Sequence, residues 1–164
     1  MIFVCVGTQL PFDRLVRAMD GWCAQNELKA FAQVADVRPD GYLPKNMAWE
    51  RFLSPDDWDE RFATADLVVA HAGMGTIISA LMAGKPIVIM PRKAARQEHR
   101  NDHQIATAQR FNDRPGIYVA MDEFELPKAL EFAIRQPAND VERLGRYADP
   151  SLIETIRGFV LSSK

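Results

Sequence analysis

A glycine-rich segment, His71-Ala72-Gly73-Met74-Gly75-Thr76, follows a short apolar and β-branched run and has the residue types of an anion site. Gly73 and Gly75 have no Cβ, so a ligand could approach the backbone closely. Thr76 could cap a helix over residues 76–83, whose first N–H groups would face the loop. A helix N-terminus opened by glycines favours negative charge, and the usual anion in an α/β protein is a phosphate.

Two further polar segments are predicted at the same edge of a sheet. Gly7-Thr8-Gln9 follows an apolar run over residues 2–6, and the polar segment 91–104 follows another over residues 86–90. Ligands of such sheets bind beyond the carboxyl ends of the strands. The second segment carries four cations, which would suit a diphosphate held without a metal: Arg92, Lys93, Arg96 and Arg100. A solvated basic loop and a plain glycine turn are the alternatives.

The hydrophobic pattern supplies the elements that would position these segments. Buried-type runs indicate strands over residues 2–6, 31–37, 48–52, 66–70, 86–90 and 116–120. Helical spacing or start signals indicate helices beginning near residues 11–12 and 54, and over residues 76–83, 101–111, 124–134 and 149–161. The alternation predicts an α/β fold: a Rossmann-like open, mostly parallel sheet with helices on both faces.

Composition narrows the class of protein. With 164 residues and 48% apolar content, the chain is expected to form one domain over residues 1–164. A formal net charge of -2 argues against nucleic acid as a partner. There is no apolar run of about 20 residues and no signal-peptide pattern, which predicts a cytosolic protein. Cys5 and Cys23 are expected to be buried, reduced thiols.

Two patterns could suggest a metal, and neither is interpreted that way. Asp57-Trp58-Asp59 matches the pattern by which some sugar transferases hold a divalent cation, but Ser54-Pro55 before it is typical of a capped helix start. His99 and His103 are spaced i, i+4, but the residues between them lack the Glu of the zinc-protease motif. No metal is therefore predicted.

Three segments together resemble a known family. They are Val6-Gly7-Thr8 with Phe12-Asp13-Arg14-Leu15, then residues 71–76, then Glu98-His99-Arg100-Asn101-Asp102-His103-Gln104. In this order they resemble the PssE type of bacterial exopolysaccharide glycosyltransferase subunit, related to the C-terminal domain of glycosyltransferase family 28. The resemblance covers residues 1 to about 137. It implies the C-terminal half of a GT-B glycosyltransferase, which binds the nucleotide sugar.

The resemblance also implies site residues and partners. The diphosphate would face Gly73, Gly75 and Thr76, and Ser79 stands where MurG-like domains carry a Glu that holds the ribose. With the basic loop and His71, the predicted nucleotide-sugar site comprises Gly7, Thr8, His71, Gly73, Met74, Gly75, Thr76, Arg92, Asn101, His103 and Gln104. The acceptor surface and the general base would belong to a membrane-anchored, PssD-like subunit. The helix over residues 149–161 could dock that partner or pack on its own domain.

The function predicted from these residues is that of a donor-binding subunit. It would serve an inverting transferase that uses a UDP-sugar, needs no cofactor, and extends a lipid-linked saccharide for exopolysaccharide. The subunit would sit at the inner membrane through its partner. An alternative is an oxidoreductase in which Asp36 holds an adenosine ribose, although Gly7-Thr8-Gln9 lacks the G-x-G-x-x-G pattern. A non-catalytic sugar-nucleotide-binding module is the other alternative.

Overall fold

The computed structural model describes residues 1–36, 38, 39, 41–136, 141, 143–145, 147, 148 and 150–162. The strands are β1 (Ile2–Cys5), β2 (Ala30–Gln33), β3 (Ala48–Glu50), β4 (Leu67–His71), β5 (Ile87–Met90) and β6 (Ile117–Val119). The helices are α1 (Asp13–Gln25), α2 (Pro55–Thr64), α3 (Met74–Ala83), α4 (His103–Phe111), α5 (Leu126–Arg135) and α6 (Pro150–Ser162). A short 3-10 helix, η1 (Ala94–Arg96), lies between β5 and α4.

All six strands form one parallel sheet in the order β3-β2-β1-β4-β5-β6. The chain first builds outward from β1 to β3, then returns to place β4 on the other side of β1 and builds outward again. The order of the strands therefore switches between β1 and β4. Connections leave the two strands in opposite directions there, which opens a crevice at their carboxyl ends.

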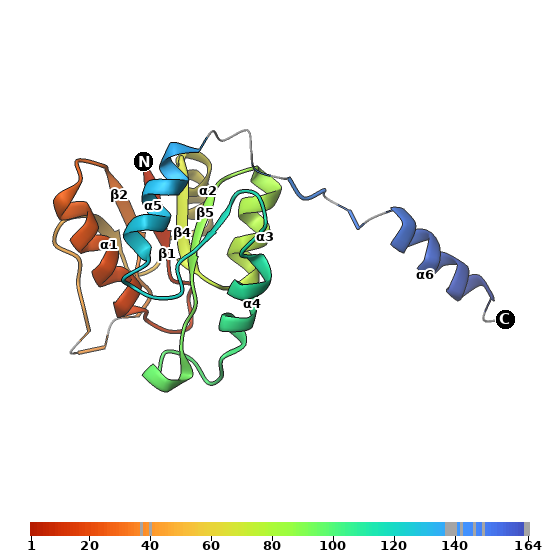
Figure 1. Cartoon of the computed structure of the whole chain (residues 1–164), viewed down its shortest axis with the longest axis horizontal. Coiled ribbons are helices and arrows are strands. Elements are labelled where there is room, and N and C mark those ends of the chain that lie inside the picture. Colours follow the sequence, from red (N-terminus) through yellow and green to blue (C-terminus); the bar gives the residue numbers. More distant parts are fainter. Residues whose placement is uncertain are drawn as a thin grey trace.

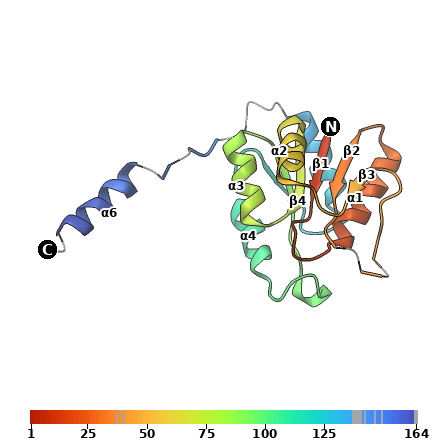
Figure 2. The same cartoon turned by 180° about the vertical axis from the view of Figure 1, so that it is seen from behind.

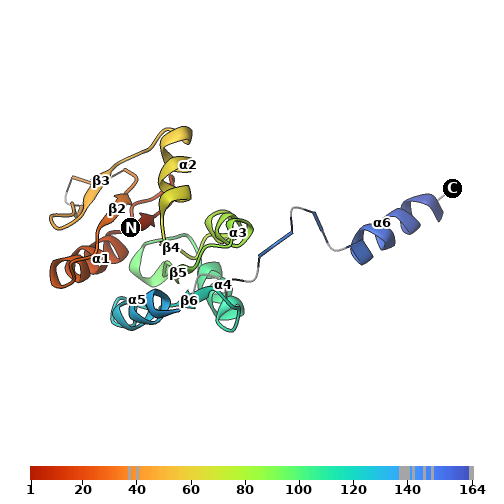
Figure 3. The same ribbon diagram turned by 90° about the horizontal axis from the view of Figure 1, so that it is seen from above.

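Helices cover both faces of the sheet (Figures 1 and 3). Successive residues of β1 point to opposite faces, so Ile2 and Val4 pack in the core layer with α1 and α5, while Phe3 and Cys5 pack in the layer with α2, α3 and α4. Because both faces are covered, β1 is buried along its whole length. The predicted fold class is confirmed, with strand and helix ends that differ by a few residues.

Local chemistry explains where several elements begin and end. The Ser54 hydroxyl accepts a hydrogen bond from Asp57 N–H at 3.2 Å and caps α2, so the helix-start interpretation of this segment is confirmed. Gly84 adopts a left-handed conformation at the end of α3. The strand expected over residues 31–37 ends at Gln33, and Val37 lies outside the described residues.

Helix α6 lies apart from the sheet and its helices (Figures 1 and 2). Every residue of α6 is exposed, so the packing of this helix on its own domain is not observed. Its large exposed apolar side chains are Leu152, Ile153, Ile156, Phe159, Val160 and Leu161. Asp149, where the helix was expected to begin, lies outside the described residues.

Candidate functional site

A polar cavity of about 330 Å³ lies at the carboxyl edge of the sheet, where the strand order switches. It is bounded by the segment after β1, the loop between β4 and α3, and the segment from β5 to α4. Its lining residues are Val6, Gly7, Thr8, Gln9, Leu10, His71, Gly73, Met74, Gly75, Arg92, His99, His103 and Gln104. The structure therefore brings together all of the predicted site residues except Thr76 and Asn101.

A larger hollow of about 630 Å³ lies along the edge strand β6 and α5. Its lining includes Tyr118, Val119 and Phe132, and residues 112–116 from the chain before β6. The smaller cavity at the switch point instead gathers three histidines, an arginine and the start of a helix. Converging polar groups mark a binding site better than volume does, so the smaller cavity is the candidate site.

Two glycines make room for the His71 imidazole at the back of this cavity. A Cβ on Gly73 would lie 2.2 Å from His71 Nε2, and a Cβ on Gly7 would lie 3.0 Å from His71 Cε1. Gly7 also has a φ of +83°, a conformation that other residues rarely adopt. Gly75 differs from both, because a Cβ there would meet no atom within 4 Å. Of these three glycines, only Gly75 borders open space.

Helix α3 begins at Met74, two residues earlier than the sequence pattern predicts. Gly73 occupies the N-cap position without a side-chain hydrogen bond, so the expectation that Thr76 caps the helix is wrong. Thr76 lies in the first turn, and its hydroxyl accepts a long hydrogen bond of 3.8 Å from the Cys5 thiol. The first backbone N–H groups of α3 have no acceptor within the helix and remain available beside the cavity.

The His71 side chain is uncharged at neutral pH. Burial lowers the pKa of His71 to about 4, and the positive charge of Arg92 adds to this effect. A neutral imidazole can accept one hydrogen bond and donate another. His71 could therefore contact an anionic ligand without contributing a charge of its own.

Arg92 is buried, and its side chain bonds to backbone carbonyls. Its Nη2 donates to Val6 O at 2.8 Å and to Leu10 O at 2.7 Å. Its Nη1 donates to Pro11 O at 2.6 Å and to Glu98 O at 3.3 Å. Both terminal nitrogens are thus already engaged by the protein, so the predicted role of Arg92 as a phosphate ligand would have to come from its charge or its remaining N–H.

The other residues of the third motif shape the cavity wall. Gln104 is buried, and its Oε1 accepts a hydrogen bond from Arg92 N–H at 3.1 Å. The rings of His99 and His103 meet edge to face with centroids 4.6 Å apart. Asn101 lies outside the cavity lining and bonds through its Oδ1 to the His103 side chain. Helix α4 begins at His103, so Asn101 precedes the helix in which it was expected.

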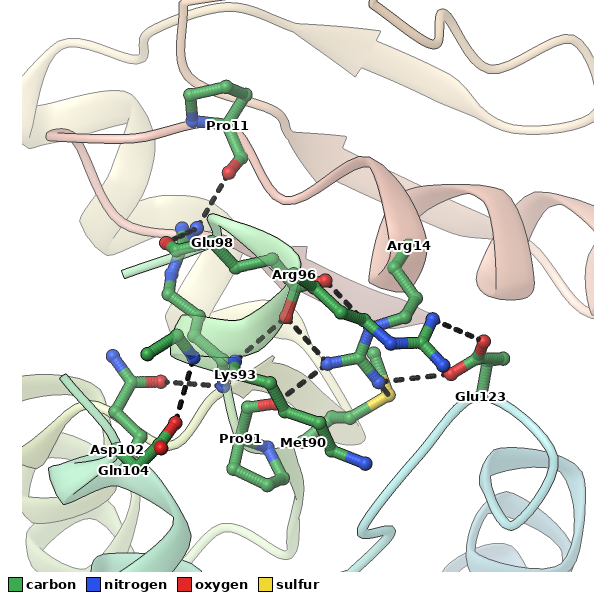
Figure 4. Close-up of polar contacts among 12 residues, drawn as sticks. Pro11, Arg14, Met90, Pro91, Lys93, Arg96, Glu98, Asp102, Gln104 and Glu123 are labelled. Carbon is green, nitrogen blue, oxygen red and sulfur yellow. Dashed lines mark hydrogen bonds and ion pairs between the residues drawn. The ribbon is translucent and has the colours of Figure 1, made fainter. Parts of the chain in front are cut away.

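Arg14 clamps the segment from β5 to α4, a role that sequence reasoning did not assign to it (Figure 4). It forms a two-point ion pair with Glu98, with both N···O distances at 2.7 Å. It also donates to Glu123 Oε2 at 3.0 Å and to Pro91 O at 2.9 Å. In the sequence, Arg14 and Glu98 lie in two separate motifs, and their opposite charges are the signal that could pair them.

Some of the positive charge in residues 92–100 therefore has a structural explanation. Arg96, which is 48% exposed at its side chain, pairs with Glu123 at 2.9 Å. Glu98 also accepts a hydrogen bond from Lys93 N–H at 2.9 Å, and Asp102 accepts one from Ala94 N–H at 2.7 Å. These bonds fold the segment back on itself beside the cavity. Arg100 is exposed.

The structure also places the cysteines and the candidate metal residues. Cys5 and Cys23 are buried and free, as expected, and burial raises the pKa of Cys5 to about 12 and that of Cys23 to about 11. In the described part of the chain, no group of three or more His, Cys, Asp or Glu residues is arranged to hold a metal ion. Over the same residues, no helix is long and apolar enough to cross a membrane.

Similar proteins include transferases of N-acetylglucosamine. The chain is 30% identical over 124 residues to the UDP-N-acetylglucosamine transferase subunit ALG13 of Mus musculus, covering 71% of this chain and 10% of that protein. It is 33% identical over 98 residues to the UDP-N-acetylglucosamine--N-acetylmuramyl-(pentapeptide) pyrophosphoryl-undecaprenol N-acetylglucosamine transferase of Bacteroides fragilis, covering 58% of this chain and 24% of that protein. The chain thus spans a quarter or less of these relatives.

Solved structures share the fold. MurG of Acinetobacter baumannii superposes with a TM-score of 0.62 at 19% identity, over 98% of this chain and 49% of that one. The glycotransferase of kitacinnamycin gives a TM-score of 0.64 at 18% identity, over 85% of this chain and 37% of that one. These neighbours are GT-B glycosyltransferases, and they confirm the predicted GT-B-like half. The model of the glycosyltransferase family 28 C-terminal domain matches residues 1–149, so the chain belongs to that family.

Proposed function

We propose that this chain is the donor-binding part of an inverting, UDP-sugar-dependent glycosyltransferase. The observation that carries the proposal is the cavity at the strand switch, which joins the free N–H groups of α3 to a glycine-flanked neutral histidine and a buried arginine. Free N–H groups at a helix start, with a cation nearby, favour the binding of a diphosphate. Family membership favours this function over the oxidoreductase alternative.

The chemistry would run through the diphosphate. An acceptor hydroxyl oxygen would form a bond to the anomeric carbon as the bond from that carbon to the β-phosphate oxygen breaks. The bonding electrons would leave with UDP, and the acceptor proton would pass to a general base. Negative charge grows on the departing phosphate, so N–H groups at Met74 and Gly75, fixed in advance, would lower the barrier.

The acceptor-binding half would be a second protein. The mouse relative is named as a subunit of its transferase, which supports a separate partner. We place the general base and the acceptor surface on a membrane-anchored, PssD-like partner, and the lipid-linked saccharide of exopolysaccharide synthesis as its substrate. The exposed apolar face of α6 is the proposed docking surface, which would hold this chain at the inner membrane.

Calorimetry with UDP and with NAD tests the donor assignment. We expect UDP to bind and NAD not to bind. Gly75 lines the cavity and has space for a side chain, so we expect the indole of Gly75→Trp to obstruct the cavity and abolish UDP binding. Gly21→Trp is the matched control: this glycine also has free space, but it lies on α1, away from the cavity. Unchanged UDP binding by a folded Gly75→Trp protein would contradict the placement of the site.

The partner is tested separately. Sugar transfer to a lipid-diphosphate saccharide is measured with this chain alone, with the membrane-anchored subunit alone, and with both. We expect transfer only with both proteins. Transfer by this chain alone would show that the general base is in this chain, and UDP binding without transfer in any mixture would favour the non-catalytic binding module.

A further inference from the structure

Two arginine side chains, Arg14 and Arg92, are buried near the candidate site, and they bind different kinds of partner. Arg14 has ion pairs with Glu98 and Glu123. The Arg92 guanidinium, by contrast, bonds to carbonyl oxygens of Val6, Leu10, Pro11 and Glu98. Among the described residues, no carboxylate forms an ion pair with Arg92. The Glu98 carboxylate is paired with Arg14, although its negative charge also favours the charged form of Arg92.

An unpaired buried cation is expensive unless something compensates for it. Arg92 is 2% exposed, so water contributes little. Burial lowers the pKa of Arg92, but only to about 10, so the guanidinium is charged at neutral pH. Carbonyl dipoles satisfy its hydrogen bonds without cancelling its charge. The charge of Arg92 acts on the cavity that it borders, since it helps to lower the pKa of His71 in the cavity lining.

The same bonds fix the course of the chain after β1. Three of the four carbonyls belong to Val6, Leu10 and Pro11, so one planar side chain holds both ends of residues 6–11. Residues 6–10 line the cavity. A guanidinium presents its donors in a rigid fork, whereas the ammonium of lysine is a flexible point charge with three donors.

We propose that Arg92 is a positioning and specificity residue that selects anionic ligands through its buried charge and through the loop it holds, without binding the phosphate through its terminal nitrogens. The inference rests on the proposed function, since it names how the same cavity prefers a diphosphate. It differs from the sequence-based expectation, in which the basic side chains of residues 92–100 act as direct phosphate ligands.

The experiment compares ligands of different charge in matched variants. Calorimetry measures binding of UDP, uridine and inorganic pyrophosphate to the unaltered protein, Arg92→Gln, Arg92→Lys and Arg100→Gln. Arg92→Gln removes the charge and keeps an amide donor, and we expect affinity for UDP and pyrophosphate to fall roughly tenfold or more while uridine changes little. Arg100→Gln removes the same charge from an exposed position, so we expect less than about a twofold effect.

Arg92→Lys separates charge from loop shape. The ratio of UDP to uridine affinity should stay within about threefold of the unaltered protein, because the charge remains. Amide hydrogen exchange over residues 7–10 should accelerate, because the fork across the carbonyls is lost. If Arg92→Gln does not fold, Arg92→Lys provides the test. A ratio of UDP to uridine affinity that falls by more than about threefold, or unchanged amide exchange over residues 7–10, would overturn the proposal.

The remaining outcomes are distinct. If Arg92→Gln binds UDP normally, or loses uridine as strongly as UDP, Arg92 does not select for charge and the inference is overturned. An equal loss in Arg100→Gln would overturn it too, since any cation would then serve. If the unaltered protein binds pyrophosphate but not UDP, the proposed donor fails while the role of Arg92 stands on the pyrophosphate comparison.

Discussion

The loops that follow β4 and β5 reach the same cavity but keep their shapes by different means. The loop after β4 is short and carries no charged side chain, and Gly73 leaves the space that the neutral His71 imidazole fills. The segment after β5 runs from Pro91 to Asp102, and two ion pairs hold it: Glu98 with Arg14 of α1, and Arg96 with Glu123. Steric fit thus shapes one wall of the cavity, and buried charge shapes the other.

The largest loss of stability is expected when the Arg14 ion pairs beside the cavity are removed. Arg14→Met would leave Glu98 and Glu123 without their shared cation, and we expect the free energy of unfolding to fall by about 3–5 kcal/mol. Denaturant titration measures this loss. Arg96→Met is the control, because Arg96 is 48% exposed and pairs with the same Glu123; its loss should stay below about 1 kcal/mol.

The double variant Arg14→Met with Glu98→Met sharpens this result. Removing both partners avoids an unpaired buried carboxylate, so the double variant should regain part of the stability lost in Arg14→Met. Equal stability of the single and double variants would mean that an unpaired Glu98 carboxylate is not what destabilises Arg14→Met.

A smaller loss of stability is expected at low pH, because the buried His71 is neutral in the folded protein. The pKa of His71 is lowered to about 4 in the folded protein, while an unfolded histidine titrates near its ordinary value of 6.5. Between these pH values the unfolded chain binds the additional proton, so His71 destabilises the fold progressively as the pH falls from 6.5 to 4, by up to about 3 kcal/mol. Below pH 4 this contribution is constant.

Urea titrations across this pH range check the His71 prediction. His71→Gln should remove the His71 part of the slope, and the difference between the two proteins isolates it from the carboxylates that also titrate in acid. If both proteins lose stability in parallel between pH 6.5 and 4, the imidazole is not held neutral by the fold.

The smallest effects are expected at Gly73 and Gly75, which differ in the space around them. Gly73→Ala would place a Cβ 2.2 Å from His71 Nε2, so the ring must move, at a cost of about 1–3 kcal/mol. Gly75→Ala meets open space in the first turn of α3 and should be neutral or stabilising by up to about 1 kcal/mol. Gly21→Ala in α1 measures the helix contribution alone. Equal losses at Gly73 and Gly75 would contradict the steric account.

Periodicity and glycine spacing predicted much of the fold. The buried β-branched run before His71, the Gly84 end of α3 and the Ser54 cap are local signals, and each was confirmed. The convergence of three segments at one edge followed from the rules of parallel sheets. The distribution of roles within the cavity did not follow, because it depends on contacts between distant residues.

Two examples show why that distribution escaped the sequence. Gly7 and His71 are 64 positions apart, so nothing local indicates that the glycine accommodates the imidazole ring. Arg92 belongs to a basic segment, and its charge alone suggests a phosphate ligand. Its acceptors are instead carbonyls within residues 6–11, and every residue has a carbonyl. A side chain that recognises backbone leaves no compositional trace at its partner.

Helix α6 is structurally independent of the sheet and the cavity. Because it buries none of its side chains, it adds almost nothing to the free energy that holds the sheet together. Substitutions at Ile156 or Phe159 are therefore expected to leave the candidate cavity unchanged, and substitutions in the cavity are expected to leave the helix unchanged. The properties of the helix and those of the cavity can therefore change, or be engineered, independently within one polypeptide.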